Sequence, residues 1–247
     1  MRGLRQLTAM DLLLYFREPI ATFFTLAFPP LLVVLFGTIY GNDPTPMFGG
    51  RGSMDVSLPA YTALILGTVA FLGIPINISS NRETGVLRRY RAAGVPEHVY
   101  ILADVITNLV MTVLGMLLLI VVGRLLYHAH IEGNPLLVLV GVLFCALSMF
   151  SIGYLIASVA PNARTAQVIG MVVFYPMMFL SGAGIPIEVM PESVRRISEF
   201  LPLTYAVRLL KGLWFGVPWS DLLLETAVLG GTMVICALLA SRFFRWE

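Results

Sequence analysis

The sequence predicts an all-α membrane protein with six transmembrane helices, an N-terminal interfacial helix, a cytoplasmic coupling helix and two short outer-leaflet helices before the last span. Two observations predict this class. Of the 247 residues, 58% are hydrophobic and only 12% are charged, whereas an average soluble domain carries about 25% charged residues. The apolar residues also gather into runs of about 20 residues or more, the length that a helix needs to cross a bilayer. Residues 1–247 are therefore predicted to form a single transmembrane domain.

The N-terminal part is predicted to lie on the membrane before the chain enters it. Residues 1–18 are typical of an amphipathic interfacial helix, in which Arg5 and Arg17 are available to lipid headgroups. Its apolar face comprises Leu4, Leu7, Met10, Leu13 and Leu14. The first span, residues 20–41, contains Pro29 and Pro30, which remove backbone donors, so we expect a kink or break there.

A short loop over residues 42–58 leads to the second span and then to the polar coupling helix, which Pro96 ends. The later spans are separated by short turns, and the third is long enough to require tilt or protruding ends. The predicted ranges are 59–80 for the second span, 82–95 for the coupling helix, and 99–126, 135–160, 165–184 and 222–244 for the remaining spans.

Residues 185–220 are predicted to form two short helices in the outer leaflet, broken at Pro202. Each half has about a dozen residues, whereas a spanning helix needs about 20. The alternative is a seventh span, which would place Arg208 and Lys211 at the bilayer centre at a cost of about 2.5 to 3.5 kcal/mol each. Six spans put both termini on one side, and because Lys and Arg are more numerous on that side, we expect cytoplasmic termini.

The coupling segment, residues 82–95, is the one polar and helix-capable stretch in the first two thirds of the chain. It carries four arginines against a single acid, Glu83, and only Val86 and Leu87 supply an apolar stripe. A stripe that narrow is unsuited to a core helix and favours docking on a partner. The alternative is a solvated basic loop that only fixes the topology.

The sequence signals no catalytic, cofactor or metal site. The only lysine, Lys211, lies outside any phosphate-binding loop, so the chain is not expected to hydrolyse ATP by that route. His128 and His130 would make at most a weak metal site, and we expect them to be solvated. Asp104 and Glu225 lie close to predicted membrane edges, where a structural role is expected and gating is the alternative. The net charge of +2 does not favour nucleic acid.

Two functional hypotheses from different classes are compatible with these patterns. The first is a transporter membrane subunit that is powered by a separate protein bound to the coupling segment. The second is a membrane-embedded enzyme acting on lipid, which would need a cluster of polar catalytic residues at one membrane face. The sequence shows no such cluster, which favours the transporter.

Two motifs carry a resemblance to the ABC-2 type permeases, the membrane subunits of ATP-binding cassette exporters. One resembles the cytoplasmic coupling segment between the second and third spans of that family, and the other resembles its signature after the fifth span. The first motif is Asn81-Arg82-Glu83-Thr84-Gly85-Val86-Leu87-Arg88-Arg89-Tyr90-Arg91 followed by Gly94-Val95-Pro96. The second is Leu180-Ser181-Gly182-Ala183-Gly184-Ile185-Pro186, Met190-Pro191 and Leu201-Pro202-Leu203-Thr204-Tyr205-Ala206.

The resemblance implies a permease of the bacterial cytoplasmic membrane that forms a homodimer, or pairs with a sister permease, and binds two ATP-binding subunits. Those subunits would hold ATP and Mg. The implied cargo is an amphipathic drug, antibiotic or lipid-like molecule, so drug efflux and antibiotic resistance are expected roles; a polysaccharide or lipid-linked glycan is the alternative. The small loop at residues 42–58 departs from members with a large extracellular domain there.

The resemblance also assigns residues. Contacts with the ATP-binding subunit are expected at Arg5, Arg17, Arg82, Glu83, Thr84, Gly85, Val86, Leu87, Arg88, Arg89 and Arg91, with Glu83 foremost. Closure of the partner would push the coupling segment and shift the second and third spans as rigid bodies. The resemblance also implies that substrate passes between two permeases along the first, second and fifth spans. Because apolar and aromatic side chains suit an amphipathic cargo, we expect the route to be lined by a set of such residues, with core packing as the alternative for each. They are Phe71, Asn77, Phe174, Tyr175, Met178 and Phe179.

Overall fold

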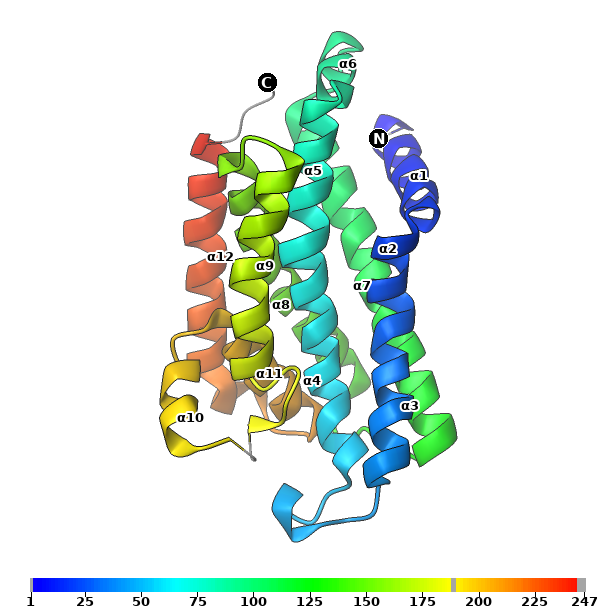
Figure 1. The fold of residues 1–247 in the computed structure, drawn as a ribbon, viewed down its shortest axis with the longest axis vertical. Coiled ribbons are helices and arrows are strands. Elements are labelled where there is room, and N and C mark those ends of the chain that lie inside the picture. Colours follow the sequence, from blue (N-terminus) through cyan, green and yellow to red (C-terminus); the bar gives the residue numbers. More distant parts are fainter. Residues whose placement is uncertain (1, 188–189, 244–247) are drawn as a thin grey trace.

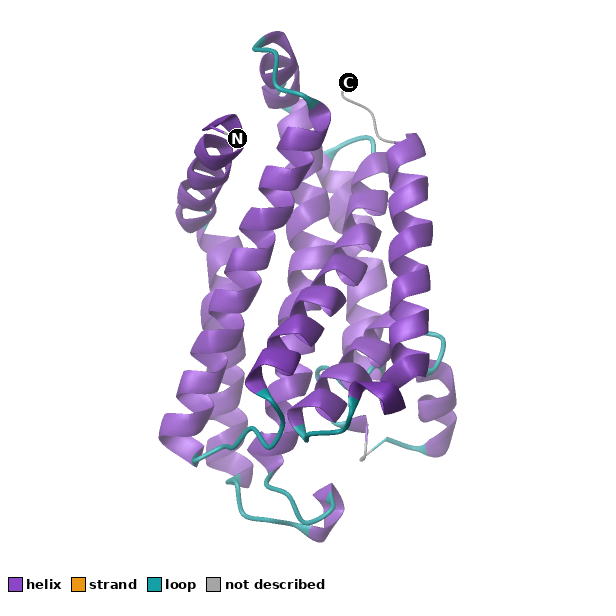
Figure 2. Cartoon of the chain, turned by 180° about the vertical axis from the view of Figure 1, so that it is seen from behind, coloured by secondary structure: helices purple, strands orange, loops and turns teal. Residues whose placement is uncertain are grey.

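Long helices run side by side along the long axis of the molecule in the computed structural model, which describes residues 2–187 and 190–243 (Figures 1 and 2). Within these residues, six helices are long and apolar enough to cross a membrane, and the described chain contains helices and one isolated β-bridge between Thr45 and Arg51. The predicted all-α class with six spans is confirmed. The spans are Phe23–Tyr40, Ser53–Glu83, Glu97–Tyr127, Pro135–Val159, Ala163–Leu180 and Trp219–Phe243.

The N-terminal helix α1 (Arg2–Arg17) is separate from the first span and packs against α7 (Glu97–Tyr127). Tyr15 is buried, and its hydroxyl forms a 2.8 Å hydrogen bond with the hydroxyl of Thr25. The apolar face predicted for this helix is divided between two surroundings, because Leu4 and Leu7 are partly buried whereas Met10, Leu13 and Leu14 are exposed. The position of α1 on the membrane surface stays a prediction.

The first span contains the irregularity that its proline pair predicts. It consists of the π-helical turn η1 (Phe23–Ala27) and α3 (Phe28–Tyr40), and the short helix α2 (Pro19–Thr22) precedes it. Pro29 and Pro30 lie in the first turn of α3, where the amide donors that they lack would have few partners. The break therefore lies just before the proline pair.

The second span is longer than predicted and is the most buried of the six. It comprises α4 (Ser53–Thr68), the π-helical turn η3 (Val69–Gly73) and α5 (Ile74–Glu83). The predicted boundary at residue 59 was wrong because the Asn42 side-chain oxygen accepts hydrogen bonds from the amides of Met54, at 2.9 Å, and Asp55, at 3.3 Å. A distant side chain thus satisfies amides that a helix start leaves without partners, and the helix begins at Ser53, inside the predicted loop.

The predicted continuous helix over residues 82–95 was also wrong. The second span continues through Arg82 to Glu83, and a separate short helix, α6 (Val86–Ala92), follows. Gly85 separates them at a φ of 73°, a left-handed conformation that glycine adopts at little steric cost. The coupling segment is therefore a helix end, a tight turn and a second helix.

The remaining elements begin and end within a few residues of the predicted positions. They are η2 (Pro46–Phe48), α8 (Pro135–Val159), α9 (Ala163–Leu180), α10 (Glu192–Ser198), α11 (Pro202–Trp214), η5 (Trp219–Leu222) and α12 (Leu223–Phe243). Asn134 caps α8 by accepting from the Leu136 amide, and Asn162 caps α9 by accepting from the Thr165 amide. Helix α9 ends four residues before the predicted span end, and the predicted end of the sixth span, residue 244, lies outside the described residues.

Helices α10 and α11 are two short helices separated near Pro202, as predicted. Helix α11 is too short to cross a bilayer and packs against α4, α8 and α12, so it is a buried wedge instead of a seventh span. Both short helices lie at the end of the bundle opposite α6 (Figure 1).

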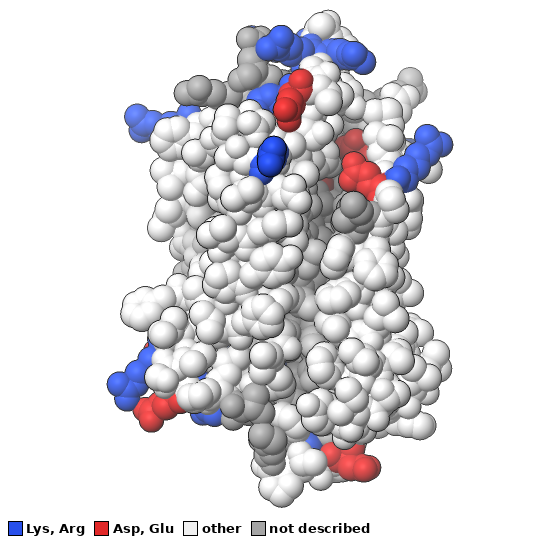
Figure 3. Space-filling view, in the orientation of Figure 1, with Lys and Arg blue, Asp and Glu red and all other residues white. Residues whose placement is uncertain are grey.

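The two ends of the bundle differ from its middle in charge. The start of α1, the end of α12 and α6 lie together at one end, which we call the α6 end (Figure 1). Lys, Arg, Asp and Glu side chains gather toward both ends, and the visible face between them is almost uncharged (Figure 3). This distribution matches a protein that crosses a bilayer several times.

Candidate functional site

Helix α6 presents arginines to the surroundings while an apolar residue and an aromatic residue fix it to the bundle. Leu87 is fully buried. Tyr90 packs against Tyr100 of α7, with ring centroids 5.8 Å apart. Arg88 and Arg89 are exposed, and basic side chains crown the α6 end in Figure 3. The helix therefore offers a positively charged surface on a fixed support.

The last residues of α5 bind the adjoining ends of α8 and α9. Arg82 donates hydrogen bonds to the carbonyl oxygens of Ala157, at 3.2 Å, and Ala160, at the C-terminal end of α8. Glu83 accepts a 3.2 Å hydrogen bond from the amide of Ala163, the first residue of α9. A cation at a helix C-terminus and an anion at a helix N-terminus both match the helix dipoles and satisfy end groups that lack partners inside the helix. The coupling segment is thus attached to the α8–α9 turn.

A second attachment lies deeper in the same three spans, about three turns along the second span and about two turns along α9. A Cβ atom added to Gly153 of α8 would lie 2.1 Å from the carbonyl oxygen of Ala70, and one added to Gly170 of α9 would lie 2.0 Å from that of Phe71. Both glycines therefore allow α8 and α9 to approach the backbone of η3 directly. With the contacts at Arg82 and Glu83, this makes α5, α8 and α9 one packed group.

Helix α7 belongs to a different group, because it packs mainly on α1, α3 and α4. Side-chain hydrogen bonds join the groups near the α6 end. Asn81 of α5 donates to the hydroxyl of Tyr100 at 3.2 Å, and the hydroxyl of Tyr154 on α8 donates to the buried carboxylate of Asp104 at 2.6 Å. Asp104 also accepts from Asn108 at 3.2 Å. These partners give Asp104 a structural role within α7 and α8.

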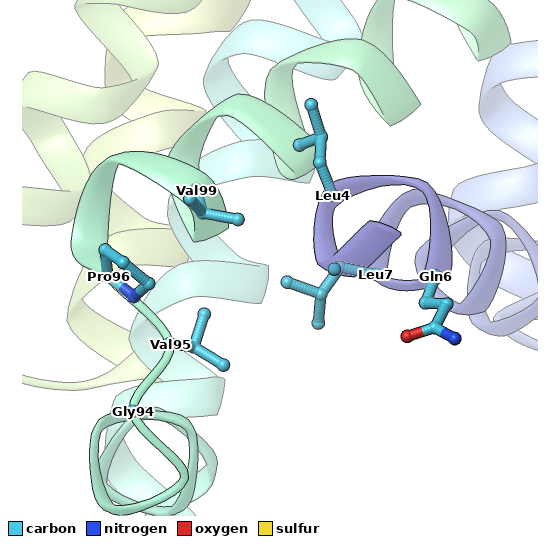
Figure 4. A pocket seen from close by; sticks show the side chains of 8 residues that line it. Leu4, Gln6, Leu7, Gly94, Val95, Pro96 and Val99 are labelled. Carbon is cyan, nitrogen blue, oxygen red and sulfur yellow. The ribbon is translucent and has the colours of Figure 1, made fainter. Parts of the chain in front are cut away.

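A cleft of about 380 Å³ lies between α1 and the link from α6 to α7. The side chains of Leu7, Val95 and Val99 point into the space between the two segments (Figure 4). Its complete lining is Gly3, Leu4, Gln6, Leu7, Gly94, Val95, Pro96 and Val99. The cleft is mostly apolar, although it lies at an end of the bundle that is rich in charge.

Helix α1 adds charged groups beside this cleft. Arg5 and Arg17 are exposed. Burial raises the pKa of the Asp11 carboxyl to about 6. Tyr90 of α6 and Asp104 of α7 are among the titratable groups that interact electrostatically with Asp11. Two of the predicted contact residues and a partly buried acid therefore belong to one helix next to α6 and α7.

The residues predicted to line a substrate route divide into two sets. Phe71 and Phe174 are buried, with ring centroids 6.2 Å apart, because Gly170 brings α9 against η3 and encloses both rings. Core packing, the alternative given for them, describes these two side chains. Tyr175 and Phe179 are exposed on α9, and their role stays a prediction. Met178 is partly buried, and Asn77 accepts a 2.8 Å hydrogen bond from Asn81.

The loop residue His130 lies in a network at the other end of the bundle. The amide of His130 donates to Asp55 at 3.0 Å, and Glu132 forms a 3.1 Å ion pair with Arg51. The Arg51 guanidinium also lies 4.0 Å from the ring centroid of Phe215. Among the described residues, no group of three His, Cys, Asp or Glu side chains is placed to hold a metal ion.

Comparisons with known proteins agree with a membrane transport role. The sequence profile of the family described as ABC-2 type transporter matches residues 2–215. Nodulation protein J of Rhizobium leguminosarum bv. viciae is 26% identical over 129 residues, which cover 51% of this chain and 48% of that protein. Inner membrane transport permease YhhJ of Escherichia coli (strain K12) is 26% identical over 187 residues, which cover 72% of this chain and 50% of that protein. The chain spans about half the length of these two relatives. Putative transport permease ycf38 of Porphyra purpurea is 23% identical over 194 residues, which cover 78% of this chain and 67% of that protein.

Proposed function

The chain belongs to the ABC-2 type transporter family, and we propose that it is the permease subunit of an exporter driven by ATP hydrolysis on a separate subunit. The observation that carries the proposal is the construction of the α6 end. There, exposed arginines stand on a helix whose preceding residues, Arg82 and Glu83, bind the ends of two further spans. Such a segment can receive a partner outside the bilayer and pass its movement to helices inside it.

The partner is an ATP-binding subunit that carries ATP and Mg, since the permease sequence has no phosphate-binding loop of its own. Arg88 and Arg89 supply positive charge for acidic side chains of that subunit. The cleft between α1 and the link from α6 to α7 supplies a pocket for an apolar side chain, the kind of buried anchor that dominates interface energetics. The two segments with predicted contacts thus form one surface, with α6 on the cytoplasmic side of a bacterial inner membrane.

The packing revises the movement expected from the sequence. From the sequence, we expected the partner to shift the second and third spans as rigid bodies. The inner half of the second span, α5, instead packs on α8 and α9, and α7 packs on α1, α3 and α4. We therefore expect movement of α6 to shift α5, α8 and α9 relative to α7. The fifth span then becomes the element that responds to the partner.

The exposed face of α9 supports a second permease copy and a route between the copies. Val168, Val172, Tyr175 and Phe179 are all exposed along this helix. A tyrosine hydroxyl in the hydrocarbon layer lacks partners unless another chain or a polar part of the cargo covers it. A homodimer with two ATP-binding subunits would place these aliphatic and aromatic side chains, with one hydroxyl among them, beside an amphipathic substrate.

Affinity purification of the full chain from its native membranes, in mild detergent, tests this function. We expect an ATP-binding cassette subunit to copurify and to hydrolyse ATP. Arg88→Glu should weaken the complex because it reverses a charge on α6. The matched control is Arg196→Glu, an exposed arginine on α10 at the opposite end. Recovery of the permease without a nucleotide-hydrolysing subunit, or equal loss of the complex in both variants, would contradict the proposal.

A further inference from the structure

A second cleft, of about 350 Å³, opens between α7, α8 and α12. Helices α7 and α12 each pack on α8, but within the described chain they hardly touch each other. Phe150 and Tyr154 of α8 line the base, Ile101 and Val105 line the α7 wall, and Ala237 lies on the α12 wall. The cleft therefore lies along the boundary between the two helix groups.

This cleft lies within the membrane-spanning helices. Its α7 residues extend from Glu97 to Val105 and its α12 residues extend from Met233 to Ser241, at the α6 ends of the two helices. Eight residues of helix rise by about 12 Å. The cleft thus runs inward from the membrane edge, and the medium beside most of it is hydrocarbon.

The polar groups in the lining already have partners inside the protein. The Tyr154 hydroxyl donates to Asp104 at 2.6 Å, and the Ser151 hydroxyl donates to the Ser148 carbonyl oxygen at 2.6 Å. The other side chains at this depth are aliphatic or aromatic. A polar cargo would find few hydrogen-bond partners there, whereas a hydrocarbon chain would contact apolar walls on three sides.

Charged residues of both signs lie at the α6 ends of the two helices that flank the cleft. Glu97 lines it at the start of α7, and Arg242 follows the lining residue Ser241 near the end of α12. A carboxylate and a guanidinium at one membrane edge match the ammonium and phosphate groups of a zwitterionic headgroup. A phospholipid with one acyl chain in the cleft would thus satisfy both its chain and its headgroup.

We propose that this cleft binds one acyl chain of a zwitterionic membrane phospholipid, and that the bound chain holds Tyr154 in place against Asp104. Tyr154 lies at the base of the cleft and its hydroxyl joins α8 to α7. Occupancy of the cleft therefore supports the boundary between the two helix groups. The binding itself does not depend on the transport role, so it can be tested on the permease alone.

The probe is phosphatidylethanolamine with a photoreactive group in its acyl chain, added to vesicles that contain the full chain. We expect the label to concentrate on α7, α8 and α12 residues of the cleft. Ala237→Trp places a large side chain in the cleft from its α12 wall. If this lowers the affinity for the acyl chain by a factor of ten, or about 1.4 kcal/mol, labelling of the α8 residues should fall by about tenfold. Ala227→Trp is the matched control, because Ala227 is exposed on the same helix but lies outside the cleft lining.

A second variant, Met233→Trp, repeats the test if Ala237→Trp does not fold, and the wild-type labelling map is independent of both. Label spread evenly over the exposed faces of α3, α9 and α12 would overturn the proposal. Equal labelling by phosphatidylglycerol would overturn the assignment of a zwitterionic lipid. An amphipathic dye that the assembled transporter exports is the last competitor. If this dye displaces the labelled lipid, the cleft is a cargo site and the lipid proposal is overturned.

Discussion

Arg82→Gln is predicted to separate ATP hydrolysis from transport. The substitution removes charge-assisted hydrogen bonds to the carbonyl oxygens of Ala157 and Ala160 at the end of α8. Hydrogen bonds to charged groups contribute about 1.5 to 3 kcal/mol each. Because Arg82 is only partly buried, we reduce the combined loss to about 1 to 3 kcal/mol, the size of a typical coupling free energy, which changes an equilibrium by about 5- to 150-fold.

The assay reconstitutes the permease with its ATP-binding subunit in vesicles and measures molecules transported per ATP hydrolysed. We expect this ratio to fall about tenfold in Arg82→Gln, while ATP hydrolysis and assembly continue. Arg82→Lys should recover part of it, because lysine keeps the charge but lacks the planar fork of arginine. The control Arg88→Gln removes an arginine of α6 that faces outward, and should weaken assembly without changing the ratio. An unchanged ratio in well-folded Arg82→Gln, or an equal fall in Arg88→Gln, would refute the reasoning.

Three further predictions follow from the packing, the charge and the exposed face. Gly170→Ala should destabilise the bundle by about 1 to 3 kcal/mol, because the added Cβ would lie 2.0 Å from the Phe71 carbonyl oxygen. A lower midpoint of thermal unfolding in detergent would show this. The control is Gly231→Ala, whose added Cβ would meet no atom within 4 Å. Burial raises the pKa of Asp11 from 3.8 to about 6, so the stability that this carboxyl contributes to α1 packing is fully present below pH 3.8 and is lost as pH rises from 3.8 to about 6. Thermal unfolding at pH 4 and pH 8 should show that loss, and Asp11→Asn should abolish it; an identical pH dependence in the variant would contradict the assignment. Tyr175→Ala should lower the affinity for an exported dye, whereas unchanged affinity in a binding titration would remove this residue from the route.

The membrane-spanning part of the fold could be predicted from the sequence, because length and apolar content alone identify helices that cross a bilayer. The division of residues 185–220 into two short helices was predicted for the same reason, since neither half is long enough to span. The helix start at Ser53 could not be predicted, because its cap comes from the side chain of Asn42 across a loop. The break at Gly85 was missed because a single glycine in a helix-compatible stretch does not reveal its φ angle.

The sequence predicted residues of the candidate site but not the contacts that they make. Its polarity and charge identified Arg82 and Glu83, but their partners lie 75 to 80 residues away at the ends of other helices. Phe71 was expected to line the substrate route because aromatic side chains suit an amphipathic cargo, with core packing as the alternative, and it is buried where Gly170 allows a close helix approach. Tyr154 gave no signal at all, since its partner Asp104 lies on another span. Contacts between distant helices therefore decide what local patterns leave open.

The distance between spin labels on the two helix groups tests the central claim most directly. In a chain with Cys145 and Cys236 replaced by alanine, labels at the exposed positions Arg164 and His98 report on α9 relative to α7, and labels at Arg164 and Thr84 report within the α5–α9 group. Both distances are measured in the assembled transporter with and without ATP. The first distance should change when ATP is bound and the second should stay constant. A constant first distance together with a changing second distance would contradict the account.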